Sequence, residues 1–299
     1  MVRRNREKNV SIHNIDFHMH SRISDGTDSP EELVARVREA EMEMFSITDH
    51  DSILSSSIVP DLVKDSGLVY VPGAEFSCQD EEGKYHILGY GYDPNASSIN
   101  ELVERGHGYR MIKVRKRLEG IKEKFSFTFT DEEVEKLLKL DNPGKPHIGL
   151  LMVKHGYAPS KEIAIKEYLD RVKVPGGYYI RPEEAISAIL RSGGVPVLAH
   201  PSYGSGDQLI LGEEMDARVK KLCGFGIRGL EAFYSGFPSK LTRNLIYLAE
   251  QYDLMVSAGS DYHGKNKMVT LGDTGVLSDY EECPPLEKFL KLMQAKGYS

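Results

Sequence analysis

Cysteine is scarce in this sequence. The 299 residues contain three cysteines, Cys78, Cys223 and Cys283, which lie far apart and form no C-x-x-C pair. An odd number of distant cysteines argues against a disulfide framework and against thiolate metal sites. The chain is therefore expected in a reducing compartment, the cytoplasm.

Long apolar runs and excess positive charge are also missing. The basic stretch MVRRNREKNVSIHN at the N-terminus is not followed by an apolar segment, so we expect a solvated arm and no signal peptide. No run is long enough to span a bilayer. The net charge of -7 excludes a global field that would attract anionic membranes or duplex nucleic acid, although a local basic patch remains compatible with it.

The composition is that of an ordinary globular chain, with 40% hydrophobic and 28% charged residues. Strand-like and helix-like segments alternate along it, which predicts an α/β fold with a parallel sheet and outer helices. One expected helix begins at Ser29-Pro30-Glu31-Glu32, a capping residue followed by proline and an acidic first turn. The expected strands are residues 12–20, 44–50, 67–75, 84–93, 195–201, 227–234 and 254–263.

The middle of the chain differs from the rest in composition and in hydrophobic pattern. Residues 95–180 are rich in Lys, Glu and Leu at helical spacing, and no strand there is followed by a ligand-type residue. We therefore expect residues 1–93 and 181–299 to form the two parts of a barrel. Residues 94–180 are expected to form a helical insertion that covers the substrate.

Metal-type side chains sit at or just past the ends of the expected strands, where a parallel barrel builds its active site. His18 and His20 are two residues apart and point the same way from a strand, so they can hold one object. Imidazoles and carboxylates without thiolates suit Mn, Fe, Zn or Ni. The candidate ligands are His18, His20, Asp25, His50, Glu75, His86, His200, Asp261 and His263.

So many ligands predict two or three divalent ions with a bridging carboxylate, for which Glu75 is the candidate. Two cations can activate a water, orient an ester and neutralise its developing charge, which favours phosphate esters as substrates. Asp16 and Asp49 are interpreted as partners that orient the imidazoles. Glu231 and Tyr234 end another strand and are candidates for lining the pocket.

The segment DFHMHSRISDGTDSPEELVARVREAEMEMFSITDHDS resembles the opening of PHP-domain (polymerase and histidinol phosphatase) proteins, with the pattern D-x-H-x-H-S, an acidic helix and T-D-H. VPGAEFS, YHILGY, VLAHP and SAGSDYHG match later motifs of this family in order. The resemblance implies a distorted (β/α)7 barrel with a mainly helical insertion. It also implies manganese, iron or zinc as the metals.

The resemblance divides the ligands among three ions. One ion is expected on His18, His20, Glu75 and Asp261, and a second on Glu75, His86 and His200. Asp25, His50 and His263 are expected to hold a third.

The insertion resembles the TrpH-like group, which includes nucleoside 3',5'-bisphosphate phosphatases and small-RNA 5'-3' exonucleases. Its segment NPGKPHIGLL has Lys145 at the position where that group usually has an arginine. Lysine offers a point charge where arginine offers a two-pronged fork. We expect Lys145, His147 and Lys173 to hold a second, non-reacting phosphate, with Arg115 as a weaker candidate.

The expected activity is hydrolysis of a phosphomonoester on a small nucleotide, such as a nucleoside 3',5'-bisphosphate, by a metal-bound hydroxide. Asp25 or His263 is expected to protonate the leaving group, and Glu75 to hold the metals. A short single-stranded RNA end is the other expected substrate. The alternatives are cyclic phosphodiester opening, histidinol-phosphate phosphatase activity, which the insertion disfavours, and a non-catalytic nucleotide-binding module.

Overall fold

The computed structural model describes residues 11–174, 176–204, 209–276 and 282–299. Most of the expected N-terminal arm lies outside the described residues. The strands form two sheets. The smaller sheet has the order β1-β2-β3 and the larger one the order β4-β5-β6-β7-β8. Their bounds are β1 Ile15–Asp16, β2 Met44–Phe45, β3 Val69–Tyr70, β4 Gly73–Gln79, β5 Lys84–Tyr90, β6 Val195–Leu198, β7 Gly229–Tyr234 and β8 Met255–Gly259.

The larger sheet is mixed, so the prediction of a parallel sheet was only partly right. β5 pairs antiparallel with both β4 and β6, whereas β6, β7 and β8 are parallel. Only four residues separate β4 from β5, and Asp80 accepts bonds from the backbone N–H groups of Glu82 and Gly83 in this turn. A parallel crossover needs about a dozen residues or more, so this connection can only form a hairpin.

The two sheets meet at isolated bridges rather than closing into one barrel. Met19 bridges to Tyr262, and His50 bridges to Glu75. Within the described residues the strands form no closed sheet, so the expected (β/α)7 barrel is not confirmed in this form. The bridges nevertheless bring the segments that carry the candidate ligands next to one another.

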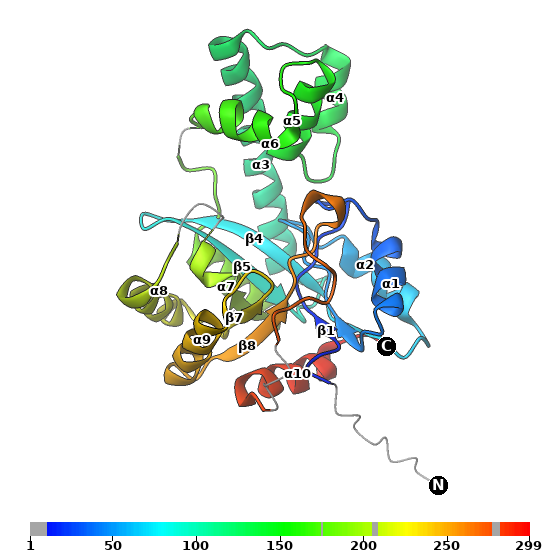
Figure 1. Cartoon of the computed structure of the whole chain (residues 1–299), viewed down its shortest axis with the longest axis vertical. Coiled ribbons are helices and arrows are strands. Elements are labelled where there is room, and N and C mark those ends of the chain that lie inside the picture. The colour runs from blue at the N-terminus through cyan, green and yellow to red at the C-terminus, as the bar shows by residue number, and fades with distance from the viewer. Residues whose placement is uncertain (1–10, 175, 205–208, 277–281) are drawn as a thin grey trace.

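Helices cover the outer faces of the sheets (Figure 1). α7 packs on β4, β5 and β6, and α9 packs on β7 and β8. The capping box of Ser29 and Glu32 begins α1 as expected, and Leu33, Val34 and Val37 are buried. The bounds of these helices are α1 Pro30–Glu39, α2 Ser55–Val63, α7 Pro182–Arg191, α8 Gly212–Phe225, α9 Ser239–Gln251 and α10 Pro284–Lys296.

An aromatic cluster joins the last helix to the main core. The ring of Phe17 lies edge-on to Tyr90 and to Phe289 of α10, with centroids 5.9 and 4.9 Å apart. All three side chains are buried, and such pairs add to the free energy of burial. The backbone just before His18 is therefore held on a rigid base.

The insertion forms a lobe with its own core. Here the helical lobe means residues 114–172, which project from the sheets in Figure 1. α3 (Ser97–Phe125) contributes Ile99 and Leu102 to the main core, and then Val114 and Ile121 to the lobe core. The other helical segments are α4 Asp131–Leu138, α5 Lys145–Lys154, α6 Lys161–Ile163, a π-helical turn Ala164–Tyr168 and a 3-10 turn Leu169–Arg171. Among the described residues, no helix has the length and apolarity that crossing a membrane requires.

Candidate metal centre

The nine candidate ligands come together at one place. They form four overlapping groups, and within each group the ligand atoms lie within 4.8 Å of one another. His18 and His20 follow β1, His50 follows β2, His200 follows β6, and Asp261 and His263 follow β8. Glu75 and His86 lie within β4 and β5, so Glu75 does not end a strand as expected. The groups are His20, Asp25, His50 and His263; His18, His20 and Glu75; His18, His200 and Asp261; and His50, Glu75 and His86.

Glu75 is at the middle of this cluster. Its Oε1 lies 2.8 Å from His86 Nδ1 and 3.1 Å from His200 Nε2. Its Oε2 lies 3.2 Å from His20 Nε2 and 3.1 Å from His50 Nδ1. Each carboxylate oxygen therefore faces a different set of imidazoles, which is the geometry that a bridging ligand needs.

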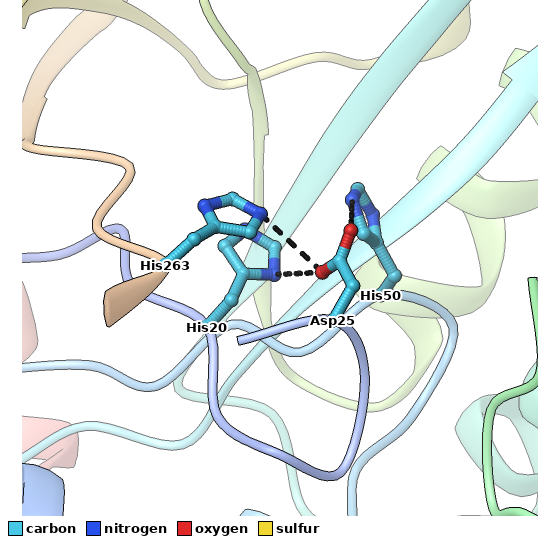
Figure 2. A group of neighbouring side chains, drawn as sticks. All are labelled: His20, Asp25, His50 and His263. Carbon is cyan, nitrogen blue, oxygen red and sulfur yellow. Dashed lines mark ion pairs between the residues drawn. The ribbon is translucent and has the colours of Figure 1, made fainter. Parts of the chain in front are cut away.

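Asp25 is surrounded by three imidazoles (Figure 2). Its Oδ1 lies 3.3 Å from His263 Nε2 and 3.7 Å from His20 Nδ1, and its Oδ2 lies 4.0 Å from His50 Nε2. The three rings come from the ends of different strands and point toward the one carboxylate. These four residues make up the most exposed of the four groups.

Asp261 divides its two oxygens between different partners. Oδ1 lies 3.4 Å from Nε2 of both His18 and His20. Oδ2 accepts a hydrogen bond from the hydroxyl of Tyr234 at 2.9 Å and lies 2.5 Å from Lys267 Nζ. Lys267 was not among the residues predicted from the sequence.

These residues fit a divalent metal. His18 Nε2 and His20 Nε2 lie 3.1 Å apart, and the two imidazoles converge on one point. Asp25 Oδ1 and His50 Nδ1 are buried atoms without a hydrogen-bond partner in the described part of the chain. Because buried polar atoms are normally satisfied, such a set of imidazole and carboxylate atoms calls for a cation.

The pKa shifts differ among the candidate ligands. Burial would raise the pKa of Glu75, but the imidazoles of His86 and His50 outweigh it and hold that pKa well below 4.5. Burial lowers the pKa of His50 to about 3, against the opposing charges of Glu75 and Asp25. An ionised carboxylate and a neutral imidazole are the forms that bind a metal, and Glu75 and His50 are in those forms. Burial would lower the pKa of His20, but Asp261 and Glu75 outweigh it and raise that pKa to about 10; neighbouring carboxylates also raise the pKa values of His18 and His200. A metal must therefore displace protons from these three imidazoles.

Glu231 supports two of the candidate ligands from behind. Its Oε1 accepts a hydrogen bond from His18 Nδ1 at 2.8 Å, and its Oε2 accepts one from the backbone N–H of His200 at 2.7 Å. A carboxylate can only accept, so His18 carries a proton on Nδ1, and Nε2 is the ring nitrogen that faces the cluster. The sequence placed Glu231 only as a residue lining the pocket.

Asp16 and Asp49 act differently from the expectation. Asp16 accepts hydrogen bonds from the backbone N–H groups of His18 and Ser260, so it fixes the backbone rather than an imidazole. Asp49 accepts a hydrogen bond from the hydroxyl of Ser24, which in turn lies 3.4 Å from His20 Nδ1. Asp49 therefore reaches an imidazole only through a serine.

A cavity of about 200 Å³ adjoins the cluster, and its lining includes His50, His86 and Asp25 of the cluster. We call it the basic cavity, because its lining includes five Lys or Arg side chains and one carboxylate. Its lysines and arginines are Lys84, Arg110, Lys113, Arg117 and Lys145.

The predicted phosphate-binding residues are only partly gathered here. Lys145 lines the basic cavity and also pairs with Asp170 at 2.5 Å. His147 is half-buried at the start of α5, where its Nδ1 accepts a bond from the N–H of Gly144. Lys173 and Arg115 are exposed and are not part of the cavity lining.

Three other basic residues of α3 face the cavity instead. Arg110, Lys113 and Arg117 are spaced i, i+3 and i+7, which places them on one side of a helix. That spacing was visible in RMIKVRKR and could have identified them. Arg110 also pairs with the buried carboxylate of Asp51, and so ties α3 to the residue after His50.

A family model described as the PHP domain matches residues 16–180, more than half of the chain. The chain belongs to the PHP-domain family. This confirms the family to which the sequence motifs pointed.

Three relatives of this PHP chain have assigned activities. A 5'-3' exoribonuclease Rnm of Salmonella typhimurium is 30% identical, over 86% of this chain and 87% of its own. A phosphoribosyl 1,2-cyclic phosphate 1,2-diphosphodiesterase of Eggerthella lenta is 28% identical, over 84% and 94%. A 3',5'-nucleoside bisphosphate phosphatase of Chromobacterium violaceum is 25% identical, over 84% and 87%.

A solved structure has the same fold. The crystal structure of a protein assigned as a metal-dependent phosphoesterase, from Bifidobacterium adolescentis, superimposes with a TM-score of 0.78 at 25% identity, over 97% of this chain and 98% of its own. Together with the PHP match and the ligand cluster, these likenesses establish a metal-dependent phosphoesterase, a hydrolase of phosphate ester bonds. The relatives act on small phosphorylated molecules or RNA ends.

Proposed function

We propose that this PHP chain removes one phosphate from a small nucleotide that carries a second phosphate, with nucleoside 3',5'-bisphosphates as the model substrates. The observation that carries this proposal is the basic cavity beside the metal centre. His50 and His86 line both places, so a phosphate held in the basic cavity lies next to one held at the metals.

The charge of the basic cavity suits a phosphate that does not react. Among the described residues, the lining has five lysine or arginine side chains and one carboxylate, that of Asp25. Arg117 and Lys113 come from α3, Lys84 from β5 and Lys145 from α5, so the phosphate would bridge the lobe and the larger sheet. Charge-assisted hydrogen bonds to phosphate are the strongest that these side chains form.

The ligand groups suggest two or three divalent ions of manganese, iron or zinc, with Glu75 as the bridge. Bound cations of this kind activate water, orient the ester and offset negative charge on the phosphoryl group. Glu75 would hold two ions through its separate oxygens. Asp25 and His263, 3.3 Å apart at the edge of the cluster, are proposed as the pair from which the leaving oxygen takes its proton.

The first test is release of inorganic phosphate from adenosine 3',5'-bisphosphate, with adenosine 5'-monophosphate as the comparison. Protein loaded with Mn²⁺ should release phosphate from the bisphosphate with the higher kcat/KM, and chelator-stripped protein should release none. Lys145→Ala should lower this preference by about tenfold, because one charged contact to phosphate is lost. Lys166→Ala, which changes an exposed lysine of the lobe, should leave it unchanged. Equal rates for both nucleotides would contradict the proposal.

A 5'-phosphorylated short RNA is the second candidate substrate. Tyr179 lines the basic cavity and also a further cavity of about 440 Å³, which contains Tyr109. Lys113 Nζ lies 3.7 Å from the centre of the Tyr179 ring. Tyrosine rings can stack on the bases of single-stranded RNA. Phosphate or mononucleotide release from a five-nucleotide RNA at a higher kcat/KM than from the bisphosphate would favour this candidate.

A further inference from the structure

Lys267 stands beside the metal cluster without being one of its candidate ligands. It follows the 3-10 turn η4 (Gly264–Asn266), which comes directly after His263. Its ammonium lies 2.5 Å from Asp261 Oδ2 and donates to the hydroxyl oxygen of Tyr234 at 2.8 Å. The side chain is 32% exposed, so the ammonium is anchored but still accessible.

The anchoring contacts leave the ammonium with spare capacity. A lysine ammonium has three N–H donors, and the described residues supply acceptors to two of them, on Asp261 and Tyr234. The Tyr234 hydroxyl in turn donates to the same oxygen of Asp261. This closed triangle fixes the position of the nitrogen and leaves one N–H for another acceptor.

The contact with Lys267 does not block the oxygen of Asp261 that faces the cluster. Oδ2 receives both Lys267 and Tyr234, whereas Oδ1 faces His18 and His20 at 3.4 Å. Asp261 can therefore serve a metal with one oxygen and hold the lysine with the other. The carboxylate of Asp261 therefore lies between the ammonium of Lys267 and the proposed metal position.

Lys267 opens onto a cavity of about 340 Å³ that contains the cluster itself. It is the only lysine or arginine in the described lining of this cavity, which also includes Tyr203, Tyr234 and six of the candidate ligands. The basic cavity is a separate cavity that shares His50 and His86 with this one. A phosphoryl group at the metals would thus have the basic cavity as one neighbour and Lys267 as another.

We propose that Lys267 binds a non-bridging oxygen of the reacting phosphoryl group, with Tyr234 and Asp261 as its positioning residues. In the reaction, a water oxygen bonds to phosphorus, the ester P–O bond breaks, and the leaving oxygen takes a proton, giving an alcohol and inorganic phosphate. Charge spreads over the non-bridging oxygens in the transition state, and a fixed ammonium offsets it. Lys267 keeps its proton throughout.

This inference rests on the phosphoesterase activity and not on the choice of a bisphosphate as substrate. The competing explanation is that Lys267 only neutralises and orients Asp261. A lysine with that role alone would affect metal binding and would not contact phosphate. Inorganic phosphate, the common product, is therefore a suitable probe, because it requires no knowledge of the natural substrate.

The experiment is calorimetric titration of inorganic phosphate into Mn²⁺-loaded protein, with the metal content of each sample measured. Lys267→Met should weaken phosphate binding by about tenfold or more with the metal content unchanged, because one charged contact is lost. Lys267→Arg should recover part of the affinity, and Tyr234→Phe should weaken binding less than Lys267→Met. Lys265→Met, two residues away and exposed, is the matched control and should bind phosphate like the wild type.

Three results would overturn the inference. They are wild-type phosphate affinity in Lys267→Met, a loss of metal in Lys267→Met that accounts for its loss of affinity, and an absence of phosphate binding by the loaded wild type. The bisphosphate proposal fails separately, through equal rates on mono- and bisphosphates. The two outcomes can therefore be told apart.

Discussion

The imidazole of His18 donates its Nδ1 proton to Glu231 at 2.8 Å, and neither side chain is exposed to solvent. The other oxygen of the same carboxylate accepts the backbone N–H of His200. One buried glutamate therefore fixes a ring on the segment after β1 and the backbone after β6. The resemblance assigned Glu231 no metal, yet two predicted ligands depend on it.

Glu231→Gln should weaken metal binding by about 10- to 100-fold, as is typical when a partner of a ligating histidine is lost. The amide keeps the shape but can no longer accept with both of its terminal atoms. Metal titration of the apoprotein, followed by elemental analysis, measures this effect. Glu213→Gln, an exposed change on α8, is the matched control. Unchanged affinity in Glu231→Gln would show that His18 needs no such support.

Glu75→Ala should remove more than one metal site at once. Because Glu75 directs its two oxygens at different imidazoles, its loss should lower the bound metal by at least two ions per chain and the rate by more than about 100-fold. His263→Ala should affect fewer ions, since His263 belongs to only one of the ligand groups. The measurements are metal content and phosphate release. Metal content and rate near those of the wild type in Glu75→Ala would refute the bridge.

Lys113 should give substrate binding a pH dependence. Burial and the neighbouring charge of Arg110 together lower the pKa of this lysine to about 7, against the opposing charge of Asp51. The charged form predominates below pH 7 and is lost above it, so the attraction for a phosphate should weaken as the pH rises from 6 to 8. The other charged or ring groups around it are Lys84, Arg117 and Tyr179.

The measurement is KM for the bisphosphate across this pH range in the wild type and in Lys113→Met. KM should rise with pH more steeply in the wild type, because the variant has no ammonium to lose. The difference between the two profiles removes the titration of the substrate and of the metals. Parallel profiles would mean that Lys113 does not contact the substrate.

Arg110→Met should destabilise the protein. The change leaves the buried carboxylate of Asp51 without its cationic partner, which costs on the order of 3 kcal/mol. Urea unfolding of the metal-free protein measures the loss in the free energy of unfolding. The double variant Arg110→Met/Asp51→Asn should recover part of it, because the uncompensated charge is gone. A double variant no more stable than the single one would show that the charge of Asp51 is not the cause.

The gathering of the candidate ligands at one place could be predicted from the sequence, because each lies in a short motif with its own spacing. His18 and His20 lie two residues apart after a strand, and Asp261 and His263 repeat that spacing after β8. Side chains two residues apart on a strand point the same way, so such pairs can be predicted without knowledge of the whole sheet. The division of the ligands among three ions stays a prediction.

The sheet topology could not be predicted as well, because the expected alternation of strands and helices was extended over a place where it breaks. The four residues between β4 and β5 leave no room for a helix, so a count of the connecting residues would have predicted the hairpin. Lys267 was missed for a different reason. Its partners, Tyr234 and Asp261, are brought to it by the pairing of β7 with β8 and by the turn after His263.

The cysteines bear on two further predictions. Cys78, Cys223 and Cys283 are all free, in agreement with the expected lack of a disulfide framework. The cytoplasmic location inferred from them stays a prediction. The domain boundary near residue 93 also stays a prediction. α3, which begins just after it, contributes to both the main core and the lobe core.

The double membership of α3 has a consequence for engineering. At 29 residues the helix is about 43 Å long, and its first turns complete the main core while its last turns complete the lobe core. A chimera that exchanges lobes between PHP relatives should therefore be joined within α3, after Leu102. A junction at Asp93 would replace Ile99 and Leu102 together with the lobe. The chimera would then lose two residues of its own main core when it acquires the substrate specificity of the donor lobe.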